Sequence, residues 1–510
     1  TRVDENGLVN YAEVLGGELL SQPVNLESDF TAVNGGSFTN ASTLVTTGGS
    51  VEGFTKTSFL IVGKTYKLII AGTTTSSAFS FGNTTSGGNE YGSGFGTFYF
   101  TASGNTAFWF RQSTAGTTNI TSFSVKEVTR DNVPRIDYTG GGCPHILAEP
   151  QRTNLVTYSE DFSDSSWVKS KATLTSGFTS PDGTLNATEI LETAVSGNHG
   201  AYYALSPASG GADYSVSMFV KKLNRRYFGL QSFYNADRGA IAFFDLDTGT
   251  LLYEFAEGTD YTVNNSKIED YGNGWYKIST TFQIPSSTVL YVGFVLADTE
   301  WTTGTSYDNP YTGDITKGAY IWGAQLEEGS YSTSYIPTNG EAGGVTRNQD
   351  IFTRDGIGSL INSTEGVLFV EMAALSNDGT FRQITLSDGT TANRILVDFT
   401  DASNQIRVFC GSGGVSQVSE TFNVTSSLSF NKIAFKYKLN DFALWVNGVE
   451  VATDTSGITP IGLNKLSFNN GAGSFDFYGK VRQLQVYDTA LGGSPYDAKL
   501  SDTRLAALTS

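Results

Sequence analysis

Short segments in which apolar and polar residues alternate recur along most of this chain. Thr65–Ile70, Asp213–Lys221 and Trp275–Phe282 are clear examples. Alternation puts every second side chain on the same face of a β-strand, so each segment has one face that can enter a core. Glycine, asparagine, serine and threonine separate the segments, and these residues favour tight turns. The pattern predicts an all-β protein.

The strongest hairpin signal is the segment FALWVNGVEV, Phe442–Val451. Asn447 and Gly448 accept the positive φ angles of a type I′ turn, and alternating apolar residues flank them. At 510 residues the chain has room for three or four domains. We expect three serial β-sandwiches, of jelly-roll or concanavalin-A-like architecture, joined by an extended strap and followed by a short helix. The expected boundaries are an N-terminal lead-in at 1–15, a first sandwich at 16–130, the strap at 131–154, a second sandwich at 155–344, a third sandwich at 345–490 and the helix at 491–510.

Two parts of this plan rest on local composition. The tract 82–96 in the first sandwich is dense in glycine, serine, threonine and asparagine, which predicts a long surface loop. The C-terminal helix is expected to begin near Ser494, a good N-cap residue, with Pro495 in its first turn and leucines near one face. The first sandwich as a whole looks inserted between parts of the chain that otherwise lie close together.

The strap, residues 131–154, follows neither the helical nor the strand period. It contains three prolines and the run Gly140-Gly141-Gly142, which disfavour regular elements. It is nevertheless rich in apolar residues, among them Val133, Ile136 and Leu147. Apolar side chains in such number are costly to expose, so we expect an ordered, extended segment that packs along the sandwiches or against a neighbouring subunit.

Charge and cysteine content exclude several classes of function. The net charge is −18 and only 32 basic residues are present, so the sequence predicts no nucleic-acid partner. No apolar run approaches the length that crosses a bilayer, so we expect no membrane insertion. The two cysteines, Cys143 and Cys410, cannot form a disulfide framework and are read as unpaired thiols of a protein made in a reducing cytoplasm.

Residues for catalysis are not found in a suitable arrangement. Glycan-cleaving enzymes need two carboxylates that face one cleft. Glu371 has no acidic residue two or four positions later, and Glu327 and Glu328 are adjacent, so on a strand they point to opposite faces. His145 and His199 lack the spaced partners of a zinc site and are expected to be structural. The sequence predicts a protein that is not an enzyme and needs no cofactor.

Sugar recognition requires less, namely aromatic faces that stack on a pyranose and planar polar groups that pair with hydroxyls. Aromatic and polar residues of this kind lie in loop-like surroundings. The candidate glycan-binding residues are Trp301, Tyr307, Asp308, Asn309 and Tyr311 in one loop, and Trp167 in another. Asp245 and Asp247 share one face at a strand end, and they are the candidate ligands if calcium binds.

An ordered series of motifs carries a resemblance to a known group of proteins. The series begins with Asn132-Val133-Pro134-Arg135, Gly141-Gly142-Cys143-Pro144, Glu149–Leu155 and Tyr158–Phe162, and continues with Ile321–Gly329 and Ser334–Thr338. It resembles a junction in tailed-bacteriophage virion proteins of tail-fibre or head-fibre type, where a sandwich similar to carbohydrate-binding modules follows. Residues from about 345 to 487 are similar to laminin-G and concanavalin-A-like sandwiches.

The resemblance implies a virion surface appendage, made in the host bacterial cytoplasm, with other virion proteins as partners. Such appendages are commonly homotrimers, so the resemblance implies an oligomer of this kind. We expect a non-enzymatic receptor-binding or fibre component whose lectin-like sandwiches bind host or environmental glycans. Two alternatives stay open: a purely structural decoration or adaptor protein of the virion, and a polysaccharide depolymerase.

Overall fold

The computed structural model describes residues 1–49, 51–76, 79–84, 90–130, 133–205, 211–235, 238–258, 261–283, 289–299, 310–490 and 509. The chain is all-β, as predicted, and the named helical elements are short: α1 (Leu26–Asp29) and the 3-10 helix η1 (Gly358–Leu360). The predicted C-terminal helix falls outside the described residues, apart from Thr509. Within the described ranges, no helix is long and apolar enough to cross a membrane.

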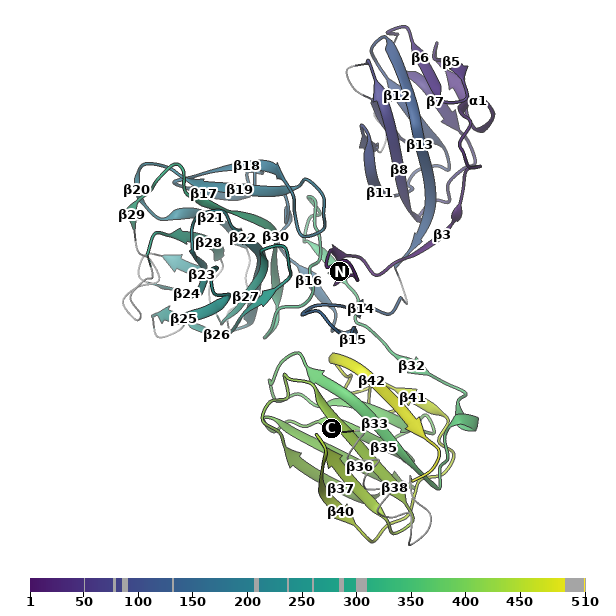
Figure 1. Ribbon diagram of the computed structural model, residues 1–510, viewed down its shortest axis with the longest axis vertical. Coiled ribbons are helices and arrows are strands. Elements are labelled where there is room, and N and C mark those ends of the chain that lie inside the picture. Colours follow the sequence, from purple (N-terminus) through teal and green to yellow (C-terminus); the bar gives the residue numbers. More distant parts are fainter. Residues whose placement is uncertain are drawn as a thin grey trace. The chain divides into compact units, whose positions relative to one another are not determined.

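The chain divides into two compact units, Tyr11–Val133 and Thr1–Asn10 with Pro134–Ser510. The smaller unit is a sandwich of two sheets (Figure 1). One sheet has the order β10 (Glu90–Ser93), β9 (Phe79–Gly82), β12 (Phe108–Gln112), β7 (Glu52–Lys56), β4 (Thr31–Val33). The other has the order β11 (Gly96–Thr101), β8 (Thr65–Thr74), β13 (Gly116–Thr129), β6 (Thr43–Thr46), β5 (Ser37–Asn40), and β3 (Val14–Glu18) also pairs with β13. Phenylalanine rings fill the core: those of Phe54 and Phe110 stack with centroids 4.6 Å apart.

The prediction of a long surface loop at 82–96 is wrong for residues 90–93, and residues 85–89 of this tract lie outside the described residues. Strand β10 lies inside this tract and pairs antiparallel with β9. Backbone hydrogen bonds to a neighbouring strand stabilise such a segment even where its side chains show no alternation. Local composition therefore does not reveal it.

The second sandwich, in the larger unit, contains two six-stranded antiparallel sheets. The first has the order β18 (Ala172–Phe178), β19 (Ala187–Glu192), β30 (Gly318–Glu328), β22 (Asp213–Lys222), β27 (Trp275–Gln283), β26 (Thr262–Asp270). The second has the order β17 (Trp167–Ser170), β21 (His199–Leu205), β28 (Leu290–Ala297), β23 (Tyr227–Asn235), β24 (Arg238–Asp245), β25 (Thr250–Glu257). Met218, Phe228, Phe244, Ile278 and Phe294 belong to the core between them.

The third sandwich pairs a six-stranded sheet with a seven-stranded one. The six-stranded sheet has the order β32 (Thr353–Arg354), β41 (Lys465–Ser467), β34 (Arg382–Ser387), β35 (Arg394–Phe399), β36 (Gln405–Ser412), β37 (Val415–Asn423). The seven-stranded sheet has the order β14 (Ile136–Asp137), β15 (His145–Ala148), β42 (Gly479–Tyr487), β33 (Glu365–Ala374), β38 (Asn431–Lys438), β39 (Phe442–Val446), β40 (Val449–Asp454). Asn447 and Gly448, at φ 48° and 88°, form the predicted tight turn between β39 and β40.

The described part of the strap, residues 133–154, is ordered, as predicted, because its strands pair with strands from later in the chain. Strand β15 pairs with β42 of the third sandwich, and β16 (Arg152–Asn154) pairs with β31 (Val345–Arg347). At the N-terminal end, the backbone N–H of Val3 donates to Asp137 of the strap over 2.7 Å. The strap thus takes part in the sheet of a sandwich whose own strands begin some 200 residues later.

Four of the motifs that carry the resemblance, Glu149–Leu155, Tyr158–Phe162, Ile321–Gly329 and Ser334–Thr338, pack on one another. The buried amide of Asn154 donates to the carbonyls of Ala324 (3.2 Å) and Ile336 (2.8 Å). The hydroxyl groups of Ser159 and Tyr335 lie 2.6 Å apart. The motifs around Asn154 and Ser159 and those around Ala324 and Tyr335 are therefore the two sides of one structural junction, held by buried hydrogen bonds.

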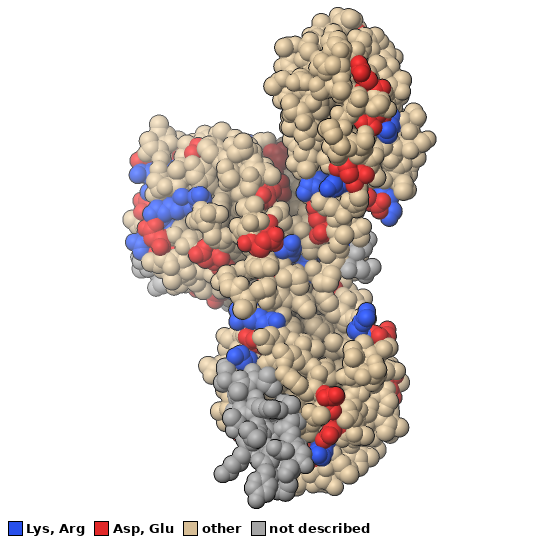
Figure 2. Space-filling view, turned by 45° about the vertical axis from the view of Figure 1, so that its right-hand side comes forward, with Lys and Arg blue, Asp and Glu red and all other residues tan. Residues whose placement is uncertain are grey.

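Charged side chains of the described residues are sparse on the face that Figure 2 shows. On the face that Figure 2 shows, lysine and arginine lie singly or beside aspartate and glutamate, among a large area of uncharged residues. This arrangement agrees with the low content of charged residues, 16%. It offers no broad basic surface for a phosphate backbone on that face.

Candidate functional site

The second sandwich carries aromatic side chains on the outer face of the sheet that contains β23. Leu230, Ala242 and Phe244 of this sheet point into the core. Side chains alternate along a strand, so the residues between them point to the opposite face. Ile241, Phe243 and Val295 accordingly form a separate apolar cluster there. We call this outer surface the aromatic face and define it by Tyr202, Tyr227, Gln231, Phe233, Phe243, Tyr253, Phe255 and Tyr291.

Three rings gather at one end of the aromatic face. The rings of Phe233 and Tyr291 stack at 5.2 Å between centroids, with an interplanar angle of 11°. Tyr202 meets both rings edge-on, at 5.2 Å from Phe233 and 5.7 Å from Tyr291. All three side chains are half-buried. Rings held by their neighbours lose little freedom when a ligand stacks on them, which favours binding.

A second group of rings lies at the other end of the same face. Phe243 is fully buried beneath Tyr227, whose ring lies 6.0 Å away, and Tyr253, whose ring lies 5.3 Å away. The guanidinium of Arg226 lies 5.1 Å from the centre of the Tyr227 ring. Two groups of rings on one sheet offer more than one place for the apolar face of a sugar.

Gln231 lies between the two groups of rings. In the sheet it is opposite Gly293 on β28 and Ile241 on β24. Its side chain is 7% exposed, and its Oε1 has no hydrogen-bond partner among the described residues. A buried amide oxygen without a partner costs about 1–3 kcal/mol. A ligand hydroxyl that donates to Oε1 would remove this cost, so the position favours a hydroxyl-bearing ligand.

Of the predicted glycan-binding residues, Trp301, Tyr307, Asp308 and Asn309 lie outside the described residues. Tyr311 is half-buried in β29 (Tyr311–Thr312), which pairs with β20 (Ser196–Gly197). Its hydroxyl donates to Glu192, and its ring lies 4.7 Å from the ring of His199. Burial, and after it Glu192, raises the pKa of Tyr311. A glycan-binding role of this loop stays a prediction.

The structure places Trp167 in the core rather than at a surface site. Its side chain is 5% exposed and packs on Phe162, with ring centroids 4.9 Å apart. Its indole N–H donates to the carbonyl of Tyr158 over 2.9 Å. The ring therefore offers no open face to a sugar. The serines before Trp167 suggested exposure, but Phe162, five residues earlier, is also fully buried and holds the indole inside.

Asp245 and Asp247 are held by basic side chains. Arg226 donates to both oxygens of Asp245, over 2.9 and 2.6 Å, and Asp247 forms an ion pair with Lys222. The hydrogen bonds from Arg226 hold the pKa of Asp245 well below its usual value. Within the described residues, no three His, Cys, Asp or Glu side chains gather to hold a metal ion. Calcium binding by these two aspartates stays a prediction.

Both histidines have structural partners. Nε2 of the buried His145 lies 3.1 Å from Asp137, and the ring nitrogens of His199 lie 2.7 Å from the carbonyl of Lys171 and 3.2 Å from that of Tyr311. The Asp137 carboxylate orients the ring of His145, and the two backbone carbonyls orient the ring of His199.

The aromatic face is absent from the sequence-based list of candidates because its strands look like core strands. Tyr227–Tyr234 and Ile241–Leu246 carry large apolar residues at both odd and even positions. In an antiparallel sandwich the outer face is ordinarily polar. Aromatic residues on both faces of neighbouring strands are therefore the signal that could have identified this site.

Residues 369–494 match the sequence profile of the concanavalin A-like lectin/glucanases superfamily. No curated protein matches the chain. Among solved structures, the chain is similar to the carbohydrate-binding module CBM40 of the Ruminococcus gnavus IT-sialidase, bound to α2,3 sialyllactose, with 16% identity, a TM-score of 0.26 and coverage of 31% of this chain and 98% of that one. The tandem CBM22 domains of Paenibacillus barcinonensis Xyn10C are 10% identical, with a TM-score of 0.23 and coverage of 63% and 100%. Domains LG4-5 of the mouse laminin α1 chain are 13% identical, with a TM-score of 0.20 and coverage of 56% and 85%. The profile match and the two packed sheets make the third sandwich laminin-G-like and concanavalin-A-like in fold.

Proposed function

We propose that this chain is a non-enzymatic surface or fibre protein of a bacteriophage virion, and that its sandwiches attach the particle to host or environmental glycans. The observation that carries the proposal is the aromatic face of the second sandwich. It combines half-buried rings with Gln231, whose buried amide oxygen has no partner among the described residues. This is the combination that binds sugars, because rings stack on pyranoses and an amide pairs with hydroxyls.

A neutral polysaccharide suits this face best. Its defining residues are seven aromatic side chains and one glutamine, with Arg226 at the margin. Affinity here would come from stacking and hydroxyl pairing rather than from charge. Single sites of this kind bind weakly, and repetition over the copies of an oligomer, for which the resemblance implies a trimer, would supply avidity.

A binding role without catalysis agrees with the surroundings of the carboxylates. Glu371 lies 3.5 Å from Arg482, and the fully buried Glu327 accepts a hydrogen bond from the backbone N–H of Thr333 over 2.9 Å. Asp398, also fully buried, accepts from Arg407 and Gln383. Hydrolysis needs two carboxylates that face one substrate. Each of these three groups has instead a fixed partner within the fold.

The virion context rests on the resemblance of the junction motifs. Arg135, Glu149 and Asn154, all from these motifs, are buried and bonded at the strap. A junction that joins sandwiches in series suits an appendage that displays them at a distance from its attachment point. Immunogold electron microscopy of purified particles tests this part: label on an appendage supports it, and unlabelled particles from cells that make the protein contradict it.

Two alternatives, a structural adaptor and a depolymerase, are separated from glycan binding by one experiment. The full chain is applied to immobilised host-surface polysaccharides as wild type, as Tyr291→Ala and as the matched control Tyr99→Ala, a tyrosine 39% exposed in the other unit. We expect binding that Tyr291→Ala removes and Tyr99→Ala keeps. No binding at all favours the adaptor, and release of reducing ends favours the depolymerase.

A further inference from the structure

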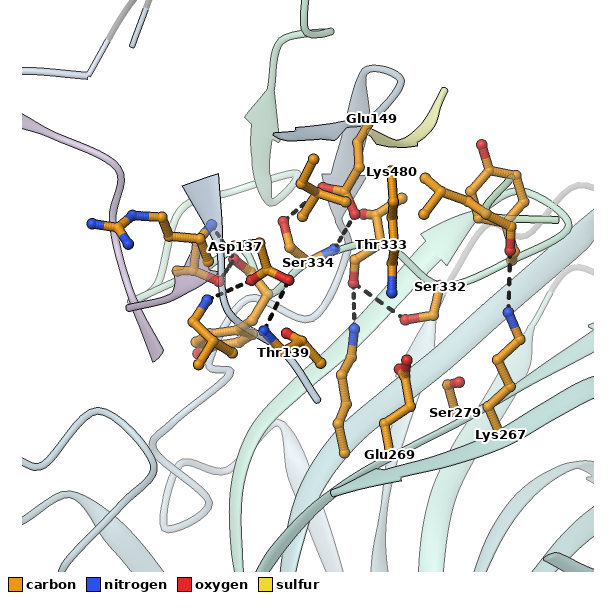
Figure 3. A pocket seen from close by; sticks show the side chains of 18 of the residues that line it. Asp137, Thr139, Glu149, Lys267, Glu269, Ser279, Ser332, Thr333, Ser334 and Lys480 are labelled. Carbon is orange, nitrogen blue, oxygen red and sulfur yellow. Dashed lines mark hydrogen bonds between the residues drawn. The ribbon is translucent and has the colours of Figure 1, made fainter. Parts of the chain in front are cut away.

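A polar cavity of about 260 Å³ lies where the strap, the second sandwich and the third sandwich contribute side chains. Lys267 on β26 and Lys277 on β27 line it from the second sandwich, and Lys480 on β42 lines it from the third. Figure 3 shows Lys267, Glu269 and Ser279 extending from one sheet toward Ser332, Thr333 and Lys480. The cavity is thus built by segments that are distant in sequence.

The lysine amines of the cavity have few partners. Lys277, 5% exposed, donates to the carbonyl of Thr333 over 2.5 Å, and Lys267 donates to the carbonyl of Leu375 over 3.1 Å. None of the three lysines forms an ion pair with a carboxylate of the described residues, and the side-chain amine of Lys480 has no hydrogen-bond partner among them. Burial, together with Lys480 and Lys277 and against the pull of Glu269, holds the pKa of Lys267 below its ordinary value.

The carboxylates of the cavity compensate only part of the positive charge of the lysines. Glu149 is held by Arg135 and Arg347, and Asp137 by His145 and the backbone of Val3. Arg2 at the wall of the cavity has its own partner, Glu5, at 3.9 Å. Glu269 is the remaining carboxylate in the lining, so one negative charge faces the positive charges of three lysines. Positive charge that is removed from water and exceeds the negative charge around it is costly, so the cavity favours an anion.

We propose that this cavity binds the carboxylate of an acidic sugar residue, with Lys267, Lys277 and Lys480 around the carboxylate. Ser279, Ser332 and Thr139 at the walls supply hydroxyl groups that can pair with the hydroxyls of a sugar ring. A hydroxylated carboxylate satisfies both the lysines and these groups. The site is separate from the aromatic face, so it does not depend on the function proposed for that face.

Isothermal titration calorimetry of the full chain with D-glucuronate tests the proposal, with D-glucose and inorganic phosphate as further probes. We expect glucuronate to bind, with an affinity that falls as salt is added, and glucose to leave no signal at the same concentrations. Binding of phosphate without glucuronate would show a general anion site and would overturn the assignment to an acidic sugar. The absence of glucuronate binding would overturn it as well.

Variants locate the binding in this cavity. Lys480→Gln should weaken glucuronate binding about tenfold or more, and Lys480→Arg, which keeps the charge, should keep most of it. Lys267→Gln should also weaken glucuronate binding, and it tests the site independently of Lys480. The exposed Lys169→Gln on β17 is the matched control and should change nothing. Thermal unfolding confirms that each variant is folded. Unchanged affinity in both Lys480→Gln and Lys267→Gln contradicts the proposal. Tyr291→Ala should leave glucuronate binding intact, which separates this site from the aromatic face.

Discussion

The guanidinium of Arg135 lies 2.5 Å from the carboxylate of Glu149, and both side chains are almost fully buried, at 7% and 4% exposure. Arg135 directly precedes β14 and Glu149 directly follows β15, so both residues lie at the open end of the hairpin that these antiparallel strands form. Glu149 also meets Arg347 at 3.0 Å, and Arg135 forms an ion pair with Asp350. One buried ionic network therefore ties the strap to the segment between the second and third sandwiches.

Glu149→Gln should destabilise the larger unit strongly. The substitution keeps the shape of the side chain but leaves Arg135 and Arg347 buried with less compensating charge. Breaking a buried ion pair costs about 3–5 kcal/mol. Chemical denaturation of the full chain measures this loss. Glu5→Gln, which removes a carboxylate 64% exposed, is the control and should cost less than about 1 kcal/mol. Equal stability of the two variants would mean that the network does not hold the junction.

Glu160 should make the stability of the larger unit depend on pH near neutrality. Burial raises the pKa of Glu160 to about 7, and hydrogen bonds from Tyr335 and Asn186 offset only part of this effect. The folded pKa lies above the unfolded value of 4.5, so the folded state holds the proton more tightly. Its contribution to stability is full below pH 4.5 and is lost as the pH rises through 7, by about 1.4 kcal/mol per unit at most.

Glu160→Gln tests this assignment. The glutamine cannot titrate, so the difference in unfolding free energy between wild type and variant should change between pH 5 and pH 8. Wild type should lose stability relative to the variant as the pH rises. A difference that stays constant over this range would show that Glu160 does not titrate there.

Gly448→Ala should weaken the hairpin of the third sandwich. Gly448 has φ +88° in the turn between β39 and β40, a region that a Cβ atom disfavours. The expected cost is about 1–2 kcal/mol. Gly17→Ala is the control, because a Cβ atom at this position would meet no atom within 4 Å and the backbone φ of Gly17 is not positive. Differential scanning calorimetry should show a lower transition temperature for Gly448→Ala alone.

Much of the fold can be predicted from the sequence because antiparallel strands and their tight turns have recognisable local sequence patterns. Alternation marks β8, β22 and β27, and Asn447-Gly448 marks a turn whose φ angles have the expected sign. The apolar content of the strap correctly indicates that its described part, residues 133–154, is ordered. The pairing of β15 with β42 is not readable, because it joins residues more than 300 positions apart and depends on backbone hydrogen bonds rather than on side-chain pattern.

The candidate site is harder to predict than the fold. Phe228 and Phe233 lie on one strand and are equally apolar, yet Phe228 enters the core and Phe233 belongs to the outer face. Whether the odd-numbered or the even-numbered side chains of a strand are buried depends on the sheet that packs against the strand. That sheet comes from elsewhere in the chain. Trp167 illustrates the opposite error: its polar neighbours indicate a surface position, whereas long-range packing buries it. Exposure is a tertiary property, and local sequence predicts it poorly.

The most direct test of glycan binding by the aromatic face is the affinity of Gln231→Leu. Isothermal titration calorimetry of the full chain measures the dissociation constant for an oligosaccharide of the polysaccharide that wild type binds, and chemical denaturation measures stability alongside. Leucine removes an amide oxygen that has no partner among the described residues, so stability should be unchanged or higher. Affinity should fall about tenfold or more, because a sugar hydroxyl loses its acceptor. Unchanged affinity would contradict the account.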